Sequence, residues 1–592
     1  MANTAYALEA PIQPEVTSGS VRKADVMTQR SAVATANPLA SQAGLDILQA
    51  GGSAVDATIA VQMVLGLVEP QSSGIGGGAL LLHSAQLGGG SRNLQAFDGR
   101  ETAPAHVDEH VFLDAQGKPL SFYGAVVGGR AVGTPGVLKM LAMAHRQHGK
   151  LPWARLFEPA IALAKEGFAI SPRLHAALRA DKYLFEDPVA RAYFYQANGL
   201  PHPEGYRLRN PELAQVLQRI ATEGVDAFYR GDVAQAIADK VQLHSGNPGS
   251  LRIEDLEQYQ ATEREVLCFD HAVRAKIFHI CGFPPPSSGT LAIGQILGLL
   301  QHAAHRFTPP TQGILDADWL HDYAQASRLA YADRAQYVAD PDFVEAPAGD
   351  WHSLLDPDYL RMRAQLMGPT SLKQAPAGIP ARAHPSALGP MPEQLEFGTS
   401  HISIVDASGN AVAMTTTIEN AFGARQMVRG FLLNNQLTDF SFVARDAQGR
   451  SIANRVQPNK RPRSSLSPTL VFDKSTGALL MSTGSPGGAM IIHFTAKTLI
   501  AVLHWGMTPQ QAIDLPNFGA LGDPMEVEEN RFSTATLQAL RARGAEVREQ
   551  SLPSGLQAIV QKNFYSADEK PRAPNAWISG TDPRREGVVL GQ

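Results

Sequence analysis

The stretch from Thr399 to Phe440 has the residue types expected around a nucleophilic hydroxyl that becomes N-terminal when the chain cuts itself. A hydroxyl residue opens an alternating strand pattern, a Ser-Gly-Asn turn follows, and a threonine-rich strand pattern returns to Thr417. If the Gly398–Thr399 bond is cut, the freed α-amine stands beside the Thr399 hydroxyl. An α-amine has a pKa of about 7.7–8, against about 10.4 for lysine, so it can act as the base that the hydroxyl needs. The alternative explanation for a single threonine in a strand is that threonine simply favours β-strands.

A glycine pair, Gly487-Gly488, stands between a strand pattern at Ala478–Ser482 and a helix pattern at Ala489–Trp505. Free N–H groups at the start of a helix carry partial positive charge. Such donors suit the oxyanion that forms in acyl transfer. The alternative is that this glycine pair only forms a tight turn and has no catalytic role.

Other polar side chains suit a substrate that carries both a carboxylate and an ammonium group. The planar guanidinium of an arginine binds a carboxylate with two parallel hydrogen bonds. Six residues are the candidates, Arg100, Ser464 and Ser465 for the carboxylate and Asp439, Gln436 and Glu419 for the ammonium. Each alone has an ordinary explanation as an ion pair, a loop residue or a helix cap. The neighbouring Arg461 and Arg463 are expected to stay in solvent or to pair with acids.

The flanking patterns predict sheets between layers of helices. Residues 37–67 have the periodicity of two helices broken at Gly51-Gly52, and residues 135–245 look mostly helical. The glycines at 74–78 lie between a helix and a strand, which is the reverse of the dinucleotide-binding order, so we reject such a site. From Thr399 onward, strand patterns predominate. Residues 368–398, rich in Pro, Ala and Gly, are predicted to be a linker that ends at the cut.

Composition narrows the class of protein. Hydrophobic residues make up 44 % and charged residues 18 %, which allows a large core. The net charge of −5 and the lack of a Lys/Arg run argue against nucleic-acid binding. No apolar run has the length of a membrane span. The first twenty residues have neither a basic n-region nor an apolar h-region, so no secretory signal is visible and the compartment stays open.

Two further sequence patterns each allow two interpretations. Cys268 and Cys281 flank a predicted hairpin, and either a disulfide or two buried thiols fits. His302 and His305 end a helical stretch without the glutamate of a zinc-protease helix, so we interpret them as a solvated helix end, with a metal site as the minor alternative.

Together these segments resemble the γ-glutamyltransferase (γ-glutamyltranspeptidase) family, from about Val33 to Gly587. Any one segment is a weak signal, but their order and spacing are specific. The matching segments are AGGSAVDA (50–57), EPQSSGIGGGAL (69–80), DGRETAPA (98–105), PPPSSGT (284–290), DPDF (340–343), GTSHISIVD (398–406), LLNNQLTDF (432–440), PNKRPRSSLSP (458–468) and TGSPGG (483–488).

The resemblance implies an α+β N-terminal-nucleophile hydrolase fold, an αββα sandwich of two stacked sheets between helical layers. It also implies a precursor that cuts itself at Gly398–Thr399. The predicted division is a lead-in at 1–35, a large subunit with its linker at 36–398 and a small subunit at 399–592. By position, the catalytic residues are Thr399, Thr417, Gly487 and Gly488. The substrate-binding residues are Arg100, Ser464 and Ser465 on the carboxylate side and Glu419, Gln436 and Asp439 on the amino side.

The implied activity is that of a γ-glutamyltransferase and glutathione hydrolase. Thr399 would form a γ-glutamyl ester and pass it to water or to an amine, with no metal or organic cofactor. The expected partners are a small γ-glutamyl substrate and the two subunits themselves. One alternative is an acylase for glutaryl side chains, such as a cephalosporin acylase, and another is a member that never matures. Asp439 favours the glutamyl substrate, because a glutaryl group has no ammonium to pair with a buried carboxylate. The family is often periplasmic or secreted in bacteria.

Overall fold

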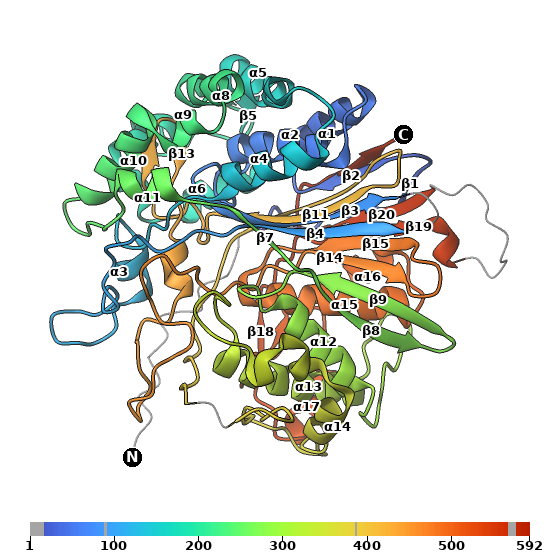
Figure 1. Cartoon of the computed structure of the whole chain (residues 1–592). Coiled ribbons are helices and arrows are strands. Elements are labelled where there is room, and N and C mark those ends of the chain that lie inside the picture. Colours follow the sequence, from blue (N-terminus) through green and yellow to red (C-terminus); the bar gives the residue numbers. More distant parts are fainter. Residues whose placement is uncertain (1–16, 88–90, 385–386, 566–575) are drawn as a thin grey trace.

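Two seven-stranded sheets lie face to face in the computed structural model, which describes residues 17–87, 91–384, 387–565 and 576–592. Helices cover the outer face of each sheet (Figure 1). In order across the first sheet, the strands are β1 (Val26–Thr28), β20 (Trp577–Thr581), β19 (Gln557–Gln561), β15 (Leu479–Gly484), β14 (Thr469–Asp473), β9 (Lys276–Gly282) and β8 (Leu267–Val273). In the second sheet they are β21 (Val588–Gly591), β2 (Ala32–Thr35), β10 (Ser400–Val405), β11 (Ala411–Thr417), β3 (Gly78–Gln86), β4 (Arg92–Gly99) and β7 (Thr262–Arg264). The predicted α+β sandwich is confirmed.

The core has three layers. Helices α1 (Pro38–Gln49), α2 (Ala54–Val68) and α4 (Val137–His148) pack on the outer face of the second sheet. Helices α12 (Gly289–Leu300) and α15 (Ile491–Leu503) pack on the outer face of the first, and α13 (Ala317–Tyr337) packs against α12. Apolar side chains such as Leu80, Leu470 and Ile559 fill the space between the sheets.

Local sequence explains the elements that were predicted correctly. Ser53 and Asp56 cap each other's backbone N–H groups at the start of α2, just after the predicted break at Gly51-Gly52. The turn between β10 and β11 forms because the Asp406 carboxylate accepts from the N–H groups of Ser408 and Asn410. The helix predicted from Ala489 begins as a short 3-10 turn, Gly488–Met490, before α15.

Part of the predicted lead-in, residues 1–35, forms β-strands. Residues 1–16 lie outside the described residues, but β1 and β2 fall within the predicted segment 1–35 and pair with strands of the two sheets. All four residues of β2, Ala-Val-Ala-Thr, are buried. A strand of four small residues has too little alternation to be recognised as half-buried, which explains the difference.

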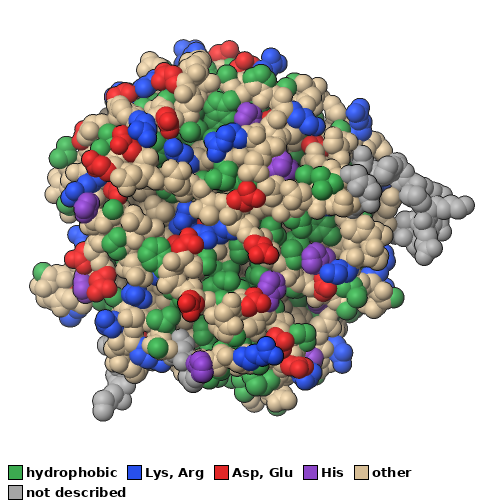
Figure 2. All heavy atoms as spheres, viewed as in Figure 1, with side chains coloured by type: hydrophobic (Ala, Val, Ile, Leu, Met, Phe, Trp, Pro, Cys, Tyr) green, Lys and Arg blue, Asp and Glu red, His purple; other side chains and the backbone are tan. Residues whose placement is uncertain are grey.

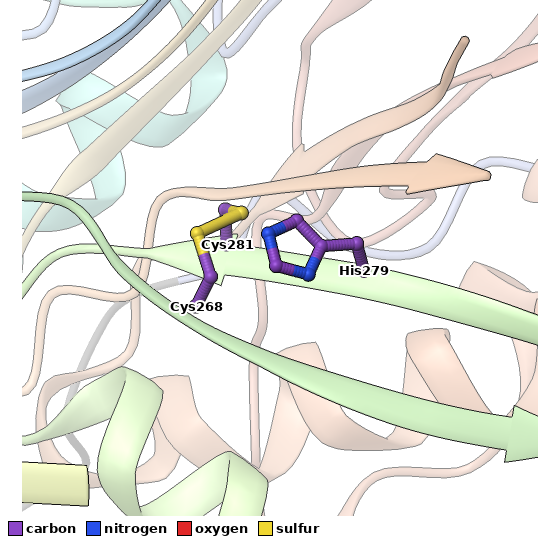
Figure 3. Close-up of side chains that lie close together, drawn as sticks. All are labelled: Cys268, His279 and Cys281. Carbon is purple, nitrogen blue, oxygen red and sulfur yellow. A yellow bond between two sulfur atoms is a disulfide. The ribbon is translucent and has the colours of Figure 1, made fainter. Parts of the chain in front are cut away.

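The cysteines form a disulfide. Cys268 on β8 faces Cys281 on β9, and the sulfurs are bonded (Figure 3). Cys268, His279 and Cys281 also form a group of three potential metal ligands, but the disulfide occupies both sulfurs. His305 lies beside Asp322 and Asp318, and in the described part of the chain it joins no group of three such ligands.

The surface seen in Figure 2 has acidic and basic side chains interspersed. No helix among the described residues has both the length and the apolar character needed to cross a lipid bilayer.

Candidate active site

Thr399 lies immediately before β10 and is fully buried. Gly398 and Thr399 are joined in one continuous chain in this structure. Ser400 pairs with Thr416 across the hairpin, and this register sets Thr399 opposite Thr417. The start of β10 therefore brings Thr399 and Thr417 close to each other.

The carbonyl that Thr399 would attack is held in place by Thr417. The Thr417 Oγ1 hydroxyl donates to the Gly398 carbonyl oxygen at 2.7 Å and accepts from the Glu419 N–H, also at 2.7 Å. Gly398 has φ +31°, and a β-carbon there would lie 2.1 Å from the Glu419 carbonyl oxygen. Only glycine fits this position, and the Thr417 hydrogen bond polarises its carbonyl group.

The glycine pair lies against the segment that precedes the cut. Gly487 and Gly488 have φ values of +133° and +56°, which favour glycine. A β-carbon on Gly488 would lie 1.9 Å from the carbonyl oxygen of Glu396. The turn that we predict to be the oxyanion site is thus covered by residues 396–397 in the uncut chain.

The residues predicted for the ammonium end are brought together around Asp439. The Gln436 amide donates to Asp439 Oδ2 at 2.6 Å, and Arg100 Nη2 forms a short ion pair with the same oxygen. Burial raises the pKa of Asp439, against the opposing effect of Arg100. Burial, and next the Asp439 charge, hold the pKa of Glu419 well above its usual range. Glu419 accepts from the Phe397 N–H at 3.0 Å.

The residues predicted for the carboxylate end make separate contacts in the structure. Arg100 Nη2 forms an ion pair with Asp439 and also donates to the carbonyl oxygen of Arg463, the residue before Ser464, at 2.8 Å. Ser464 Oγ accepts from the Leu466 N–H within its own turn. Ser465 Oγ donates to the carboxylate of Glu396 at 2.5 Å.

The expectation that Arg461 and Arg463 stay in solvent is wrong. Arg461 is 7 % exposed and Arg463 is 4 % exposed. Arg461 Nε lies 3.5 Å from Asp98, and Arg463 Nη2 lies 3.6 Å from Glu396. Burial of a guanidinium requires an anionic partner, so the second expectation, pairing with acids, holds.

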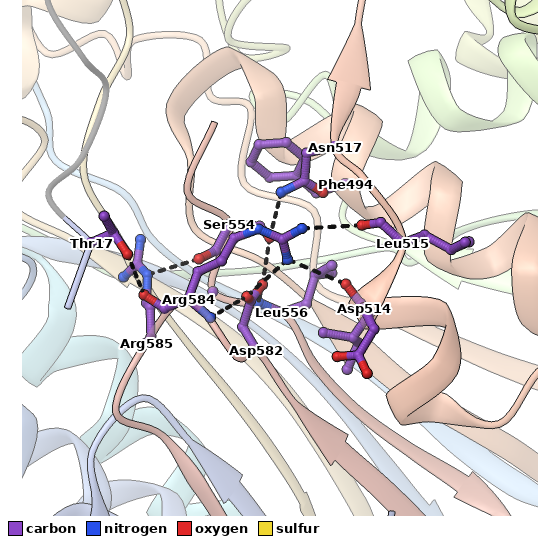
Figure 4. A network of polar contacts seen from close by, with 12 residues as sticks. Thr17, Phe494, Asp514, Leu515, Asn517, Ser554, Leu556, Asp582, Arg584 and Arg585 are labelled. Carbon is purple, nitrogen blue, oxygen red and sulfur yellow. Dashed lines mark hydrogen bonds and ion pairs between the residues drawn. The ribbon is translucent and has the colours of Figure 1, made fainter. Parts of the chain in front are cut away.

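Three residues near the site could not be predicted from a sequence pattern. Arg334 and Glu396 form a buried ion pair, and Arg585 Nη1 donates to the Thr399 carbonyl at 3.3 Å. Figure 4 shows Arg585 at the edge of a network that joins Ser554, Asp582 and Arg584. Only the KRPRSSLSP segment, already part of the resemblance, pointed to this neighbourhood.

Comparisons with known proteins agree with the fold and the site. The family model for gamma-glutamyltranspeptidase matches residues 40–592, and the chain belongs to this family. It is 34 % identical to the glutathione hydrolase proenzyme of Escherichia coli over 97 % of this chain and 96 % of that protein. It is 37 % identical to the Bacillus subtilis glutathione hydrolase proenzyme over 82 % of this chain and 79 % of that one. The cephalosporin acylase of Bacillus halodurans superposes with a TM-score of 0.80 at 25 % identity, covering 98 % of this chain and 99 % of that one.

Proposed function

We propose that this protein cuts itself between Gly398 and Thr399 and then acts as a γ-glutamyltransferase and glutathione hydrolase. The observation that carries the proposal is the hydrogen bond from Thr417 to the Gly398 carbonyl, one residue before the buried Thr399. A hydroxyl that donates to this oxygen stabilises the negative charge that develops there during attack. Family membership and the glutathione hydrolase relatives support the same activity.

The first reaction is the self-cleavage. Thr399 Oγ attacks the Gly398 carbonyl carbon, the bond to the Thr399 nitrogen breaks, and that nitrogen takes up the hydroxyl proton. Water then hydrolyses the resulting ester, which leaves a carboxylate on Gly398 and a free α-amine on Thr399.

The second reaction uses the new terminus. The α-amine takes the proton of the Thr399 hydroxyl, whose oxygen attacks the γ-carbonyl carbon of the substrate. The N–H groups of Gly487 and Gly488 stabilise the oxyanion. The leaving amine departs with the proton, and a γ-glutamyl ester stays on Thr399. Water then yields glutamate, and an amine yields a new γ-glutamyl compound.

A glutaryl acylase is the second candidate, and two observations bear on it. The cephalosporin acylase structure matches nearly the whole chain. In addition, Arg100 supplies Asp439 with a cationic partner, so a substrate without an ammonium would not leave this carboxylate unpaired. In the uncut chain, the expected cost of burying Asp439 without a cationic partner therefore does not distinguish the γ-glutamyl activity from the glutaryl activity. The glutathione hydrolase relatives support the glutamyl substrate.

Denaturing electrophoresis tests the self-cleavage. We expect wild type to give fragments of 398 and 194 residues (592 − 398), and Thr399→Ala to stay as one chain without amidase activity. Thr399→Ser keeps a hydroxyl and should cut, though more slowly. An uncut wild type with full activity would reject the mechanism. Preference of wild type for a glutaryl over a γ-glutamyl anilide would favour the acylase instead.

A further inference from the structure

Four side chains that can bind or support a metal ion lie on one face of the β8–β9 hairpin. Cys268 pairs with Cys281 across the two strands, and Asp270 pairs with His279. Side chains two positions apart on a strand point to the same side of the sheet, so these two pairs are neighbours on that side. The hairpin therefore presents two sulfurs, one imidazole and one carboxylate within a small area. It belongs to the first sheet, whereas β10 belongs to the second.

The three potential ligand atoms are close enough to bind one ion. The sulfurs of Cys268 and Cys281 and a ring nitrogen of His279 all lie within 4.8 Å of one another. Figure 3 shows the His279 ring turned toward the two sulfurs. In a tetrahedral zinc site, with Zn–S of about 2.3 Å and Zn–N of about 2.0–2.1 Å, ligand atoms are about 3.5–3.8 Å apart. Small side-chain rotations would thus bring the three atoms onto one ion once the S–S bond is opened.

Asp270 prepares His279 to act as a ligand. Asp270 Oδ1 lies 2.6 Å from His279 Nδ1, and Lys474 Nζ lies 3.3 Å from Asp270 Oδ2. A neutral imidazole that donates its Nδ1–H to a carboxylate keeps the lone pair of Nε2 for a metal. The carboxylate also fixes the orientation of the ring and raises the basicity of Nε2. This pairing of a carboxylate with a histidine is the support that zinc-binding histidines commonly have.

The disulfide decides whether the two sulfurs can serve as ligands. Cys281 is fully buried, but Cys268 is half-buried and lies on β8, at the end of its sheet. An external thiolate can therefore approach from the Cys268 side. Two thiols RSH convert the disulfide to two cysteine thiols and are themselves oxidised to RSSR, through a mixed disulfide. When a divalent ion binds, the two cysteine thiols lose their protons to solvent and become thiolate ligands.

We propose that the reduced β8–β9 hairpin binds one Zn²⁺ through Cys268 Sγ, Cys281 Sγ and His279 Nε2, with water as the fourth ligand. Two thiolates and an imidazole favour Zn²⁺ over Mg²⁺ or Ca²⁺, which prefer oxygen ligands. The His279 side chain is 29 % exposed, so solvent can supply the fourth ligand. This site goes beyond the proposed function, because it lies on the other sheet and needs no acyl substrate.

The zinc ion replaces the disulfide as the cross-link at this sheet edge. Within the described residues β8 pairs only with β9, and reduction removes the covalent bond between the two strands. An ion bound to both cysteines and to His279 joins the strands again. The hairpin therefore keeps a cross-link in both oxidising and reducing surroundings.

Cobalt spectroscopy on the full chain tests the site. The protein is reduced with a phosphine, freed of reductant under argon and titrated with Co²⁺, which reports tetrahedral thiolate ligation by a charge-transfer band and strong visible d–d bands. We expect reduced wild type to bind one Co²⁺ per chain with these bands, and Zn²⁺ but not Mg²⁺ to displace it. Oxidised wild type should show no such bands. Their absence from the reduced protein, or equal bands in the oxidised protein, would overturn the proposal.

Two variants test the roles of the imidazole and of its carboxylate. Asp270→Asn, which removes the charged support of the ring, should weaken Co²⁺ binding about 10- to 100-fold. His279→Gln removes a ligand, so it should weaken binding more and abolish the tetrahedral bands. Both variants keep the cysteines, so their folding can be checked in the oxidised form. Wild-type affinity in His279→Gln would show that the two thiolates alone hold the ion, which contradicts the three-ligand site.

His110→Gln is the matched control. His110 Nδ1 lies 3.1 Å from Asp108 Oδ1, which is the same pairing of imidazole and carboxylate, but both cysteines of the chain lie in the β8–β9 hairpin. This variant should bind Co²⁺ as wild type does. A loss equal to that of His279→Gln would show that the effect is not specific to the hairpin and would reject the site.

Hydrogen exchange tests the cross-link itself. The β8 amides of wild type should exchange faster after reduction, and Zn²⁺ should slow them again. In reduced His279→Gln, Zn²⁺ should restore much less protection. If Zn²⁺ binds to reduced wild type but leaves β8 exchange unchanged, the ion does not join the two strands and the assignment of ligands on both of them is wrong.

Discussion

The reaction centre and the region that would anchor the substrate are both largely buried but differ in charge. At the Gly398 carbonyl, the contacts join neutral groups, namely the hydroxyl of Thr417, the carbonyl of Gly398 and the N–H of Glu419. The anchoring region, defined here as Arg100, Arg334, Glu396, Asp439 and Arg463, consists of charged side chains. Bond breaking is thus assigned to hydroxyl and backbone groups, and positioning is assigned to ions.

This difference explains how the precursor can be stable and yet ready to react. Neutral hydrogen bonds at the reaction centre need no counter-ion, and the base appears only when the α-amine is freed. In the anchoring region each carboxylate has an arginine partner, because Asp439 has Arg100 and Glu396 has Arg334.

The largest effect should come from the reaction centre. Thr417→Val keeps the shape of the side chain but removes the donor to the Gly398 carbonyl. Loss of one donor to a developing oxyanion costs about 10²- to 10³-fold. Self-cleavage, followed by timed electrophoresis, should slow by this factor. Thr417→Ser should restore most of the rate, and a Val variant that cuts at the wild-type rate would contradict the role.

A change in the anchoring region should affect turnover and spare the cut. Asp439→Asn keeps a side chain that can accept from Gln436 but loses the charge that would bind an ammonium. A hydrogen bond to a charged group contributes about 1.5–3 kcal/mol, so kcat/KM for γ-glutamyl anilide should fall about 10- to 100-fold. Glutaryl anilide, which has no ammonium, is the matched control and should lose much less. Failure of this variant to cut itself would show that the two regions are not separable.

The sequence predicted the local parts of both regions. The β10–β11 turn depends on Asp406 and on residues within four positions of it, so a short pattern was enough. The pairing of Arg100 with Asp439 spans 339 residues, and that of Arg334 with Glu396 spans 62. No spacing rule reports such contacts. Resemblance placed Arg100 near the site, but only the fold shows which carboxylate it meets.

The pH dependence of turnover tests where the base resides. The free α-amine of Thr399, with a pKa of about 7.7–8, is the active base only above that pKa. The value of kcat/KM should therefore rise with pH, by roughly 20-fold between pH 6.5 and 8.5. Asp439→Asn should keep the same rising profile at a lower level, because it alters the anchoring region alone. A flat profile in wild type would point to a different base.

The smallest effect on activity should come from the disulfide at the sheet edge. Its 13-residue separation corresponds to about 3 kcal/mol of stability in the chain-entropy account. Cys268→Ser with Cys281→Ser should lower the free energy of unfolding by about that amount in denaturant titrations. The strand that carries Cys281 leads to Ser288, whose hydroxyl accepts from Arg334, so the disulfide supports the anchoring region and not the reaction centre. We therefore expect KM to rise less than threefold with the rate of self-cleavage unchanged. A slower cut with an unchanged KM would reverse that assignment.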